Sequence, residues 1–551
     1  MSMSLRNLLP VVFLAGLGAV AVASLPFSGE PPADFTFING SEPKSLDPHL
    51  VTGQPEGRLV SAIFERLVRW DPATLEVVPG LAERWEVSDD GTRYTFHLRD
   101  AAWSDGVPIT AETVEQSWRR LLDPATGAEY SSQLFAVKGA EAFATGKASD
   151  FGATVGVRAV DARTLVVELL APTPYFLHVC GFYPLAPVPL QAIARHGSPG
   201  WTKPGTIVAS GPYTLGFRRL RDRVRLVKNE RYHAADSVRL GVVDALAVDS
   251  ATTALALYET AQVDWSTALP PFAVRELAAR AAPDLRRSPE LTIGFYRLNT
   301  TRPPLDDARV RRALALSIDR ERIVAAVFGP GERPSRSFVP PGIETATGYE
   351  PVECEGENVP EARRLMTEAG FVGGRGFPKI TISFNADEGH QMVAELVQSQ
   401  WKERLGIDVG LEAMEWGSFL DAQGRLDYWV GRAGWGADYV DPNTFLDLFT
   451  STNANNQTGF SSSRYDDLIA RAAKATDRDA RNEIFHEAES LLLRELPVIP
   501  LYVRSSRNLV APWVKGFVGN PLDWHPIESL DVDRPARDAA RSRRGHAQRR
   551  R

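Results

Sequence analysis

The chain has 551 residues, of which 44% are hydrophobic and 24% charged, and its formal net charge is -7 at pH 7. This length exceeds the roughly 250 to 300 residues at which a single hydrophobic core stops growing, so we expect two or more lobes. The composition is typical of a soluble globular protein, and the charge gives no general reason to expect a nucleic-acid partner. Neither catalysis nor binding follows from these numbers.

The first residues have the pattern of a secretory signal. Arg6 precedes an apolar run over 8–23, which ends in Ala21-Val22-Ala23. The run is shorter than the ~20 residues that a spanning helix needs, so we predict a signal peptide over 1–23, with an uncleaved membrane anchor as the alternative. No lipid-attachment cysteine follows the run, which favours export to a bacterial periplasm. No other segment is apolar and long enough to span a bilayer.

Two cysteines are present, and their context does not favour a disulfide. Cys180 lies in an apolar stretch and Cys354 in an acidic segment. We expect no essential bridge between them.

Strand-like and helix-like segments are mixed along the chain, which predicts an α/β fold. Residues 92–99 and 164–169 alternate apolar and polar side chains as half-buried strands do. A helix is predicted over 109–122, with Thr110 as its N-cap, and another over 306–328, whose apolar positions follow the 3.6-residue period.

The chain ends in a basic segment over 531–551. From Arg534 onward it contains eight arginines and one acid, and it is too polar to bury a core. We therefore predict a disordered tail. Anchorage on an anionic lipid surface is the functional alternative.

Residues 432–442, RAGWGADYVDP, are predicted to be a strand-to-helix junction. Gly434 and Gly436 lack side chains, so another backbone can approach there and pair as an added strand. Asp438 follows them, and a carboxylate at the end of such a ladder is what the N-terminal ammonium of a peptide needs when it leaves water. The alternative is a tight turn in which Asp438 is only a local cap.

Several stretches resemble, in the same order, one family: the extracellular solute-binding proteins, family 5, of peptide ABC transporters. Together they span most of the chain. They are residues 38–50, 63–124, 210–233, 302–324, 432–446 and 497–517.

The resemblance implies an α/β periplasmic-binding-protein fold with two lobes that close on a ligand like a flytrap. It places an extra subdomain in the first lobe. The implied bounds are 35–60, 180–290 and 500–530 for lobe I, 61–179 for the extra subdomain, and 291–499 for lobe II.

The resemblance also implies roles for charged residues. Asp438 pairs with the α-ammonium of a peptide, while Gly434 and Gly436 offer main-chain partners. Basic side chains meet the C-terminal carboxylate, and the corresponding positions are Arg302, His390 and Arg432. Alternatively, Arg302 and His390 are solvated loop residues, and Arg432 is a structural partner of Asp438 or Asp441.

Aromatic and polar positions complete the implied site. Trp416 and Tyr130 correspond to aromatics that line side-chain pockets, with ordinary core packing as the alternative. A polar run over 453–460 lies where the family has one near its ligand. The chain departs from the family at Gln423, which replaces an arginine, and at Gly436, which replaces a cysteine and so removes a disulfide found in relatives.

These features predict a monomeric receptor that captures oligopeptides and delivers them to a membrane permease with separate ATPase subunits. We expect no cofactor, no metal and no reaction. An exported hydrolase is unsupported, because the sequence has no serine nucleophile elbow, no His-Glu-x-x-His and no Cys-x-x-Cys. A binder of a metal chelate, haem or oligosaccharide on the same fold remains an alternative, as does a passive envelope protein.

Overall fold

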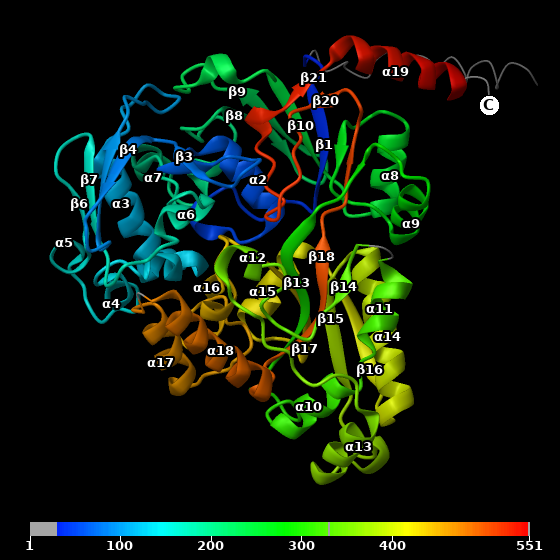
Figure 1. The fold of residues 1–551 in the computed structure, drawn as a ribbon. Coiled ribbons are helices and arrows are strands. Elements are labelled where there is room, and N and C mark those ends of the chain that lie inside the picture. Colours follow the sequence, from blue (N-terminus) through cyan, green and yellow to red (C-terminus); the bar gives the residue numbers. More distant parts are fainter. Residues whose placement is uncertain (1–29, 329–330, 476, 549–551) are drawn as a thin grey trace, which may run out of the picture.

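The computed structural model describes residues 30–328, 331–475 and 477–548. The predicted signal peptide lies outside these residues. The three larger sheets divide the chain into an upper lobe, a lower lobe and a subdomain beside them (Figure 1).

The upper lobe, lobe I, is built on a seven-stranded mixed sheet. Its strands come from three separate parts of the chain, and helices α2 (Gln54–Ile63), α7 (Leu190–His196), α8 (Ala251–Glu259) and α9 (Pro271–Ala279) contribute to this lobe. In spatial order the strands are β12 (Leu285–Arg286), β19 (Asn508–Val510), β11 (Trp265–Ser266), β1 (Phe35–Gly40), β10 (Val242–Ala247), β9 (Arg223–Lys228) and β8 (Tyr213–Arg219).

Lobe II is built on a six-stranded sheet with a core on each face. Its strands, in spatial order, are β14 (Arg333–Pro334), β18 (Val498–Ser505), β13 (Pro289–Leu298), β17 (Val430–Gly436), β15 (Ile380–Asn385) and β16 (Val409–Met414). One core includes α10 (Ala308–Leu316), α11 (Arg320–Val327), α13 (Val359–Glu368) and α14 (Glu388–Leu405). The other includes α16 (Asn443–Leu446), α17 (Ser463–Ala472) and α18 (Arg478–Glu495).

The extra subdomain is a four-stranded antiparallel sheet with short helices. The strands are β4 (Ala82–Val87), β5 (Arg93–Leu98), β7 (Thr164–Glu168) and β6 (Val157–Ala159). The helices are α3 (Ala111–Leu122), α4 (Ala140–Ala144), α5 (Phe151–Thr154) and α6 (Phe176–Cys180).

Most locally predicted elements have the expected bounds. The strand predicted over 92–99 is β5, and the helix predicted over 109–122 is α3, where the Thr110 hydroxyl accepts from the Thr113 N–H at 3.3 Å. The single helix predicted over 306–328 is wrong, because α10 ends at Leu316 and α11 begins at Arg320. The Asp319 side chain accepts from the Arg322 N–H and so caps a new helix.

The two lobes are joined by neighbouring crossings. β12 leads into β13 and β18 leads into β19, and the Ser506 N–H donates to the Ser288 carbonyl at 2.9 Å between them. The predicted boundary at 499/500 differs from the structure, since it cuts through β18, which belongs to the sheet of lobe II. Strand β18 is buried and paired with β13, so the chain enters lobe I only after Ser505.

The prediction of a disordered tail is wrong for the part of the segment that the structure describes. Residues Arg534–Gln548 form helix α19, which lies beside lobe I (Figure 1). Arg537 donates to the Asp34 carbonyl, and Arg541 forms an ion pair with buried Asp264 at 3.3 Å. These contacts hold the helix against the lobe. Composition alone does not reveal them, because their acceptors lie far away in the sequence.

Both cysteine thiols are free, with Cys180 buried and Cys354 half-buried. Within the described ranges, no helix is long and apolar enough to cross a membrane.

Candidate ligand-binding site

Strand β17 offers a free edge at its glycines. It pairs with β13 along its whole length, from Val430 opposite Leu298 to Gly436 opposite Thr292, but with β15 only at Val430 and Gly431. The second edge is therefore unpaired from Arg432 onward in the described structure.

The main-chain groups of Gly434 and Gly436 point to this free edge. The Ala437 N–H donates to the Leu291 carbonyl, and hydrogen-bonded pairs alternate along an antiparallel ladder. The main-chain N–H and C=O groups of the odd-numbered residues of β17 thus bond to β13, while those of the even-numbered residues point to the opposite edge of the strand. The Arg432 carbonyl follows this rule, because it accepts from the Gln423 side chain at 2.8 Å. An extended ligand can pair with Gly434 and Gly436.

Asp438 lies just beyond this edge as a buried carboxylate that has no cation partner among the described residues. Its side chain accepts from Gln133 Nε2 at 3.3 Å, and its own N–H donates to Thr444 Oγ1 at 3.0 Å. Burial raises the pKa of Asp438 well above its usual range, and the charge of Asp447 raises it further. A ligand cation would remove this penalty.

The neighbouring acid Asp441 already has its cation. Arg481 donates to both of its carboxylate oxygens, at 2.7 and 2.8 Å. The alternative prediction, in which Arg432 pairs with Asp438 or Asp441, is wrong, because neither acid contacts Arg432.

Arg432 and His390 lie together at the cleft. Arg432 Nη1 donates to Asn385 at 3.5 Å, its buried Nε has no partner, and burial lowers the pKa of its guanidinium. His390 lies in the first turn of α14, and burial, followed by the charge of Arg432, lowers the pKa of its imidazole to about 3. The ring is therefore neutral at physiological pH beside a positive guanidinium.

Arg302 does not join them. It lies beyond the Leu298/Val430 end of the β13–β17 ladder, opposite to the end that carries Gly436. Its guanidinium stacks on Trp429, 3.9 Å from the ring centroid, and pairs with exposed Asp427 at 3.8 Å. The structure thus separates Arg302 from Arg432 and His390.

The two predicted aromatics contact other parts of the molecule across the cleft. Tyr130 is buried, with its ring 6.1 Å from that of Trp435 in β17. Trp416, in α15 (Trp416–Gly424) of lobe II, donates through Nε1 to Glu56 of lobe I at 3.3 Å. Both residues lie where the lobes and the subdomain meet.

Further polar contacts hold the lobes together. Lys44 pairs with Asp421 at 2.5 Å, and the predicted polar run contributes Gln457, which donates to Glu129 at 3.1 Å. Gln423, at the position of a family arginine, accepts from Arg297 and so belongs to this buried network. Because these contacts join lobe I and the extra subdomain to lobe II, the cleft between the lobes is closed in this structure.

Sequence reasoning missed three polar residues of this cleft: Gln133, Thr444 and Arg504. Gln133 lies outside the stretches that resemble the family, whereas Thr444 lies within the stretch 432–446, and only their contacts with Asp438 single out these two residues. Arg504 lies within the stretch 497–517 that resembles the family, but only the structure shows that its charge acts on Arg432 and His390.

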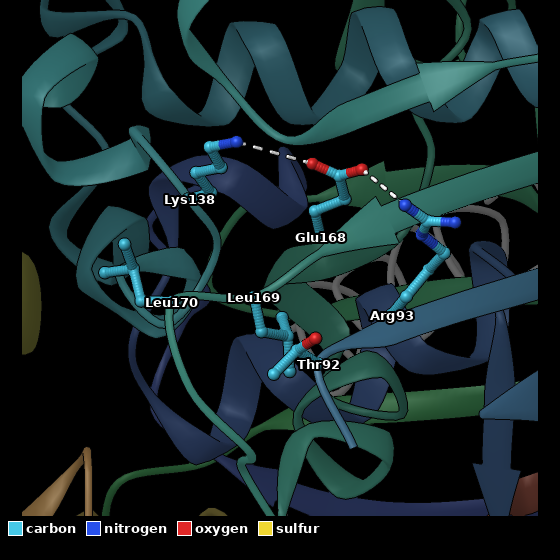
Figure 2. Close-up of a pocket in the computed structure, with 6 residues that line it drawn as sticks. All are labelled: Thr92, Arg93, Lys138, Glu168, Leu169 and Leu170. Carbon is cyan, nitrogen blue, oxygen red and sulfur yellow. Dashed lines mark hydrogen bonds and ion pairs between the residues drawn. The ribbon is translucent and has the colours of Figure 1, made fainter. Parts of the chain in front are cut away.

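A separate shallow pocket lies on the extra subdomain (Figure 2). Its charged lining residues are Arg93, Lys138 and Glu168, and Glu168 pairs with Arg93 at 3.3 Å and with Lys138 at 3.6 Å. All three side chains are exposed and paired with one another. The pocket is formed by β5, β7 and the loop before α4, so it is not part of the cleft around Asp438.

Relatives of known sequence match nearly the whole chain. The periplasmic oligopeptide-binding protein OppA of Salmonella typhimurium is 35% identical over 504 residues, which cover 90% of this chain and 91% of that protein. The probable deoxycholate-binding periplasmic protein YgiS of Escherichia coli is 34% identical over 528 residues, covering 94% and 97%.

Solved structures match as well. OppA of Haemophilus influenzae in complex with RPPGFSPFR has a TM-score of 0.87 at 32% identity, covering 91% of this chain and 99% of that one. The unliganded open form of the murein tripeptide-binding protein MppA, also 32% identical and covering 91% and 98%, has a TM-score of only 0.60. The lower score agrees with the closed arrangement of the lobes described here.

These matches confirm the predicted two-lobed α/β fold. The family model for bacterial extracellular solute-binding proteins, family 5, matches residues 76–457. The chain belongs to this family of extracellular solute-binding proteins.

Proposed function

We propose that this protein captures oligopeptides between its two lobes and delivers them to an ABC transporter in the bacterial inner membrane. The relatives named above are binding proteins, and one of them has been solved with a bound peptide. In this proposal the protein is exported to the periplasm, acts as a monomer, and meets a permease whose separate ATPase subunits supply the energy.

The observation that carries the proposal is the buried Asp438 carboxylate, without a cation in the described structure, at the end of the free glycine edge of β17. A peptide α-ammonium supplies the missing charge and three N–H donors. The ligand main chain pairs with Gly434 and Gly436, which do not depend on the identity of ligand side chains.

Arg432 and His390 take the other end of the ligand in this proposal. Asp438 is six positions after Arg432, which corresponds to roughly 20 Å of extended strand. Allowing for the reach of the two side chains, a peptide of roughly three to five residues fits between them. Longer peptides then need a different partner for their carboxylate.

Calorimetric titration of the purified, ligand-stripped protein tests the proposal. Free-amine tri- to pentapeptides are compared with their N-acetylated forms, and the protein is compared with Asp438→Asn. Micromolar or tighter binding that loses about 2 kcal/mol or more on either change supports the amine anchor. Asp427→Asn is the matched control, since Asp427 is exposed at the far end of β17.

Deoxycholate serves as the competing ligand, because the name of one relative points to it. It has a carboxylate but no ammonium group, so it cannot form an ion pair with Asp438. Binding of deoxycholate with no binding of free-amine peptides would overturn the proposal.

A further inference from the structure

Gln423 occupies a main-chain acceptor on the free edge of β17. It lies in α15, its side chain is buried, and its Nε2 donates to the Arg432 carbonyl at 2.8 Å. Gly431 leaves room for this amide, since a methyl group added there would lie 3.2 Å from the same nitrogen. The edge is therefore free at Gly434 and Gly436, but a side-chain donor already meets it at Arg432.

Arg297 fixes which end of the Gln423 amide faces β17. Arg297 of β13 is buried, and its Nη1 donates to Gln423 Oε1. A guanidinium group can only donate, so Oε1 has to face it, and Nε2 is left for the Arg432 carbonyl. Arg297 is held in turn by Gln457 Oε1, at 2.6 Å, and by the Asn455 carbonyl, at 3.4 Å. The Gln423 amide is thus a fixed donor, not a side chain that is free to turn away.

Asp438 sets the register of a peptide on this edge in the proposed mode of binding. Asp438 follows Gly436 in the chain, so a peptide whose α-ammonium meets Asp438 runs antiparallel to β17. In an antiparallel ladder, the pairs that exchange both hydrogen bonds recur at every second residue. Residue 1 of the peptide is then opposite Gly436, residue 3 opposite Gly434 and residue 5 opposite Arg432.

The N–H of residue 5 would need the carbonyl that Gln423 already occupies. We infer that Gln423 ends the peptide ladder, so that the main chain of a ligand is bound to β17 through its first residues and leaves the strand before residue 5. This inference rests on the proposed peptide-binding function. It makes Gln423 a residue that determines specificity for peptide length, because a fifth residue gains no main-chain hydrogen bond from β17.

The position of the Arg432 guanidinium supports the same limit. A methyl group added at Gly434 would lie 3.3 Å from Arg432 Nη2, so the guanidinium lies back over the glycine that faces residue 3. The proposed partner of the C-terminal carboxylate is therefore beside the last residue that the free edge can pair.

Calorimetry with N-methylated peptides on the purified, ligand-stripped protein tests the inference. The probe is Lys-Ala-Ala-Ala-Ala, either unmodified or with one N-methyl group on residue 3 or residue 5. Methylation of residue 3 removes the donor for the Gly434 carbonyl and is expected to weaken binding by about tenfold or more. Methylation of residue 5 is expected to change the affinity by less than about twofold.

Gln423→Ala frees the Arg432 carbonyl, so the N–H of residue 5 can pair with it. In this variant, methylation of residue 5 is expected to weaken binding by about fivefold or more. Gln457→Ala is the matched control, because Gln457 also accepts from Arg297 but does not contact the Arg432 carbonyl. It is expected to stay insensitive to methylation of residue 5.

An equal loss from the two methyl groups in the unaltered protein overturns the inference without any variant, because the second lone pair of the Arg432 oxygen then binds residue 5. Methylation of residue 5 that stays without effect in Gln423→Ala overturns it as well, because another feature then ends the ladder. Either result, in a protein whose binding depends on the free amine and on Asp438, overturns this inference alone. If methylation of residue 3 costs nothing, or if the unmodified peptide does not bind, the proposed mode of binding falls and the inference with it.

Discussion

Arg481 donates to both carboxylate oxygens of Asp441, at 2.7 and 2.8 Å, and is held against the rings of Tyr175 and Phe485. This pairing leaves Asp438, three residues earlier, without a cation in the described structure. Two aspartates in one short segment thus differ in their surroundings: Asp441 has a cation partner at the junction between β17 and α16, and Asp438 has none among the described residues.

Replacing Asp438 by asparagine is expected to stabilise the ligand-free protein. The folded-state pKa of Asp438 lies above its unfolded value, so ionisation costs stability as the pH rises from about 4 through the folded pKa. The amide of the variant carries no such charge, and we expect the free energy of unfolding at pH 7 to rise by about 1 kcal/mol or more. Urea denaturation at pH 5 and pH 8 measures this. Asp427→Asn is the control, for which we expect the same free energy of unfolding as for the unaltered protein at both pH values. If Asp438→Asn also matches the unaltered protein at both pH values, the Asp438 carboxylate is already neutralised.

The three predicted basic residues are expected to divide in their effect on affinity. Arg432→Gln removes a guanidinium from the closed cleft and should weaken peptide binding by about 2 kcal/mol or more. Arg302→Gln breaks a surface ion pair with Asp427 and the stacking on Trp429, both outside the cleft, and should change the binding free energy by less than about 0.5 kcal/mol. Titration of one tripeptide against both variants compares them directly, and a larger loss in Arg302→Gln would contradict the placement of Arg302.

His390 is expected to stay neutral over the physiological range. Burial and the charge of Arg432 hold the pKa of its ring at about 3. A histidine with a lowered folded pKa contributes stability that is present above its unfolded value of about 6.5 and is lost as the pH falls from there through the folded pKa. Histidine-ring NMR of the protein, with His390→Gln to assign the signal, should show no protonation between pH 8 and pH 5. Titration near pH 6.5 would mean that the ring is solvated.

Glu489 in α18 organises the loop that covers it, and its loss should be costly. Its carboxylate accepts from the N–H groups of Phe338, Val339 and Val352 and from the Tyr349 hydroxyl at 2.6 Å. Glu489→Gln points an amide donor at these donors, so we expect a loss of about 2 to 4 kcal/mol in the free energy of unfolding. Denaturant titration checks this, with exposed Glu487→Gln as the control. An unchanged midpoint would show that the loop does not depend on this carboxylate.

Local patterns predicted the parts of the fold that depend on neighbours in sequence. The alternation over 92–99 and the capping threonine at 110 led to β5 and α3, since pleating and capping involve residues a few positions apart. The same reasoning joined α10 to α11, because an apolar period continues across a cap. It also misjudged the tail, where the groups that receive Arg537 and Arg541 are hundreds of residues away.

By itself, the sequence determined the family, the α/β class, and the association of two glycines with an aspartate at the end of a strand. The tertiary structure alone decided which aspartate is left without a cation in the described chain, which of three basic residues reach the cleft, and that the charge of Arg504 acts on Arg432. The physical reason is that a charge is neutralised by groups that packing brings near it. Arg481 is 40 residues from Asp441, and the strands that carry Arg432 and Arg504 meet only through β13.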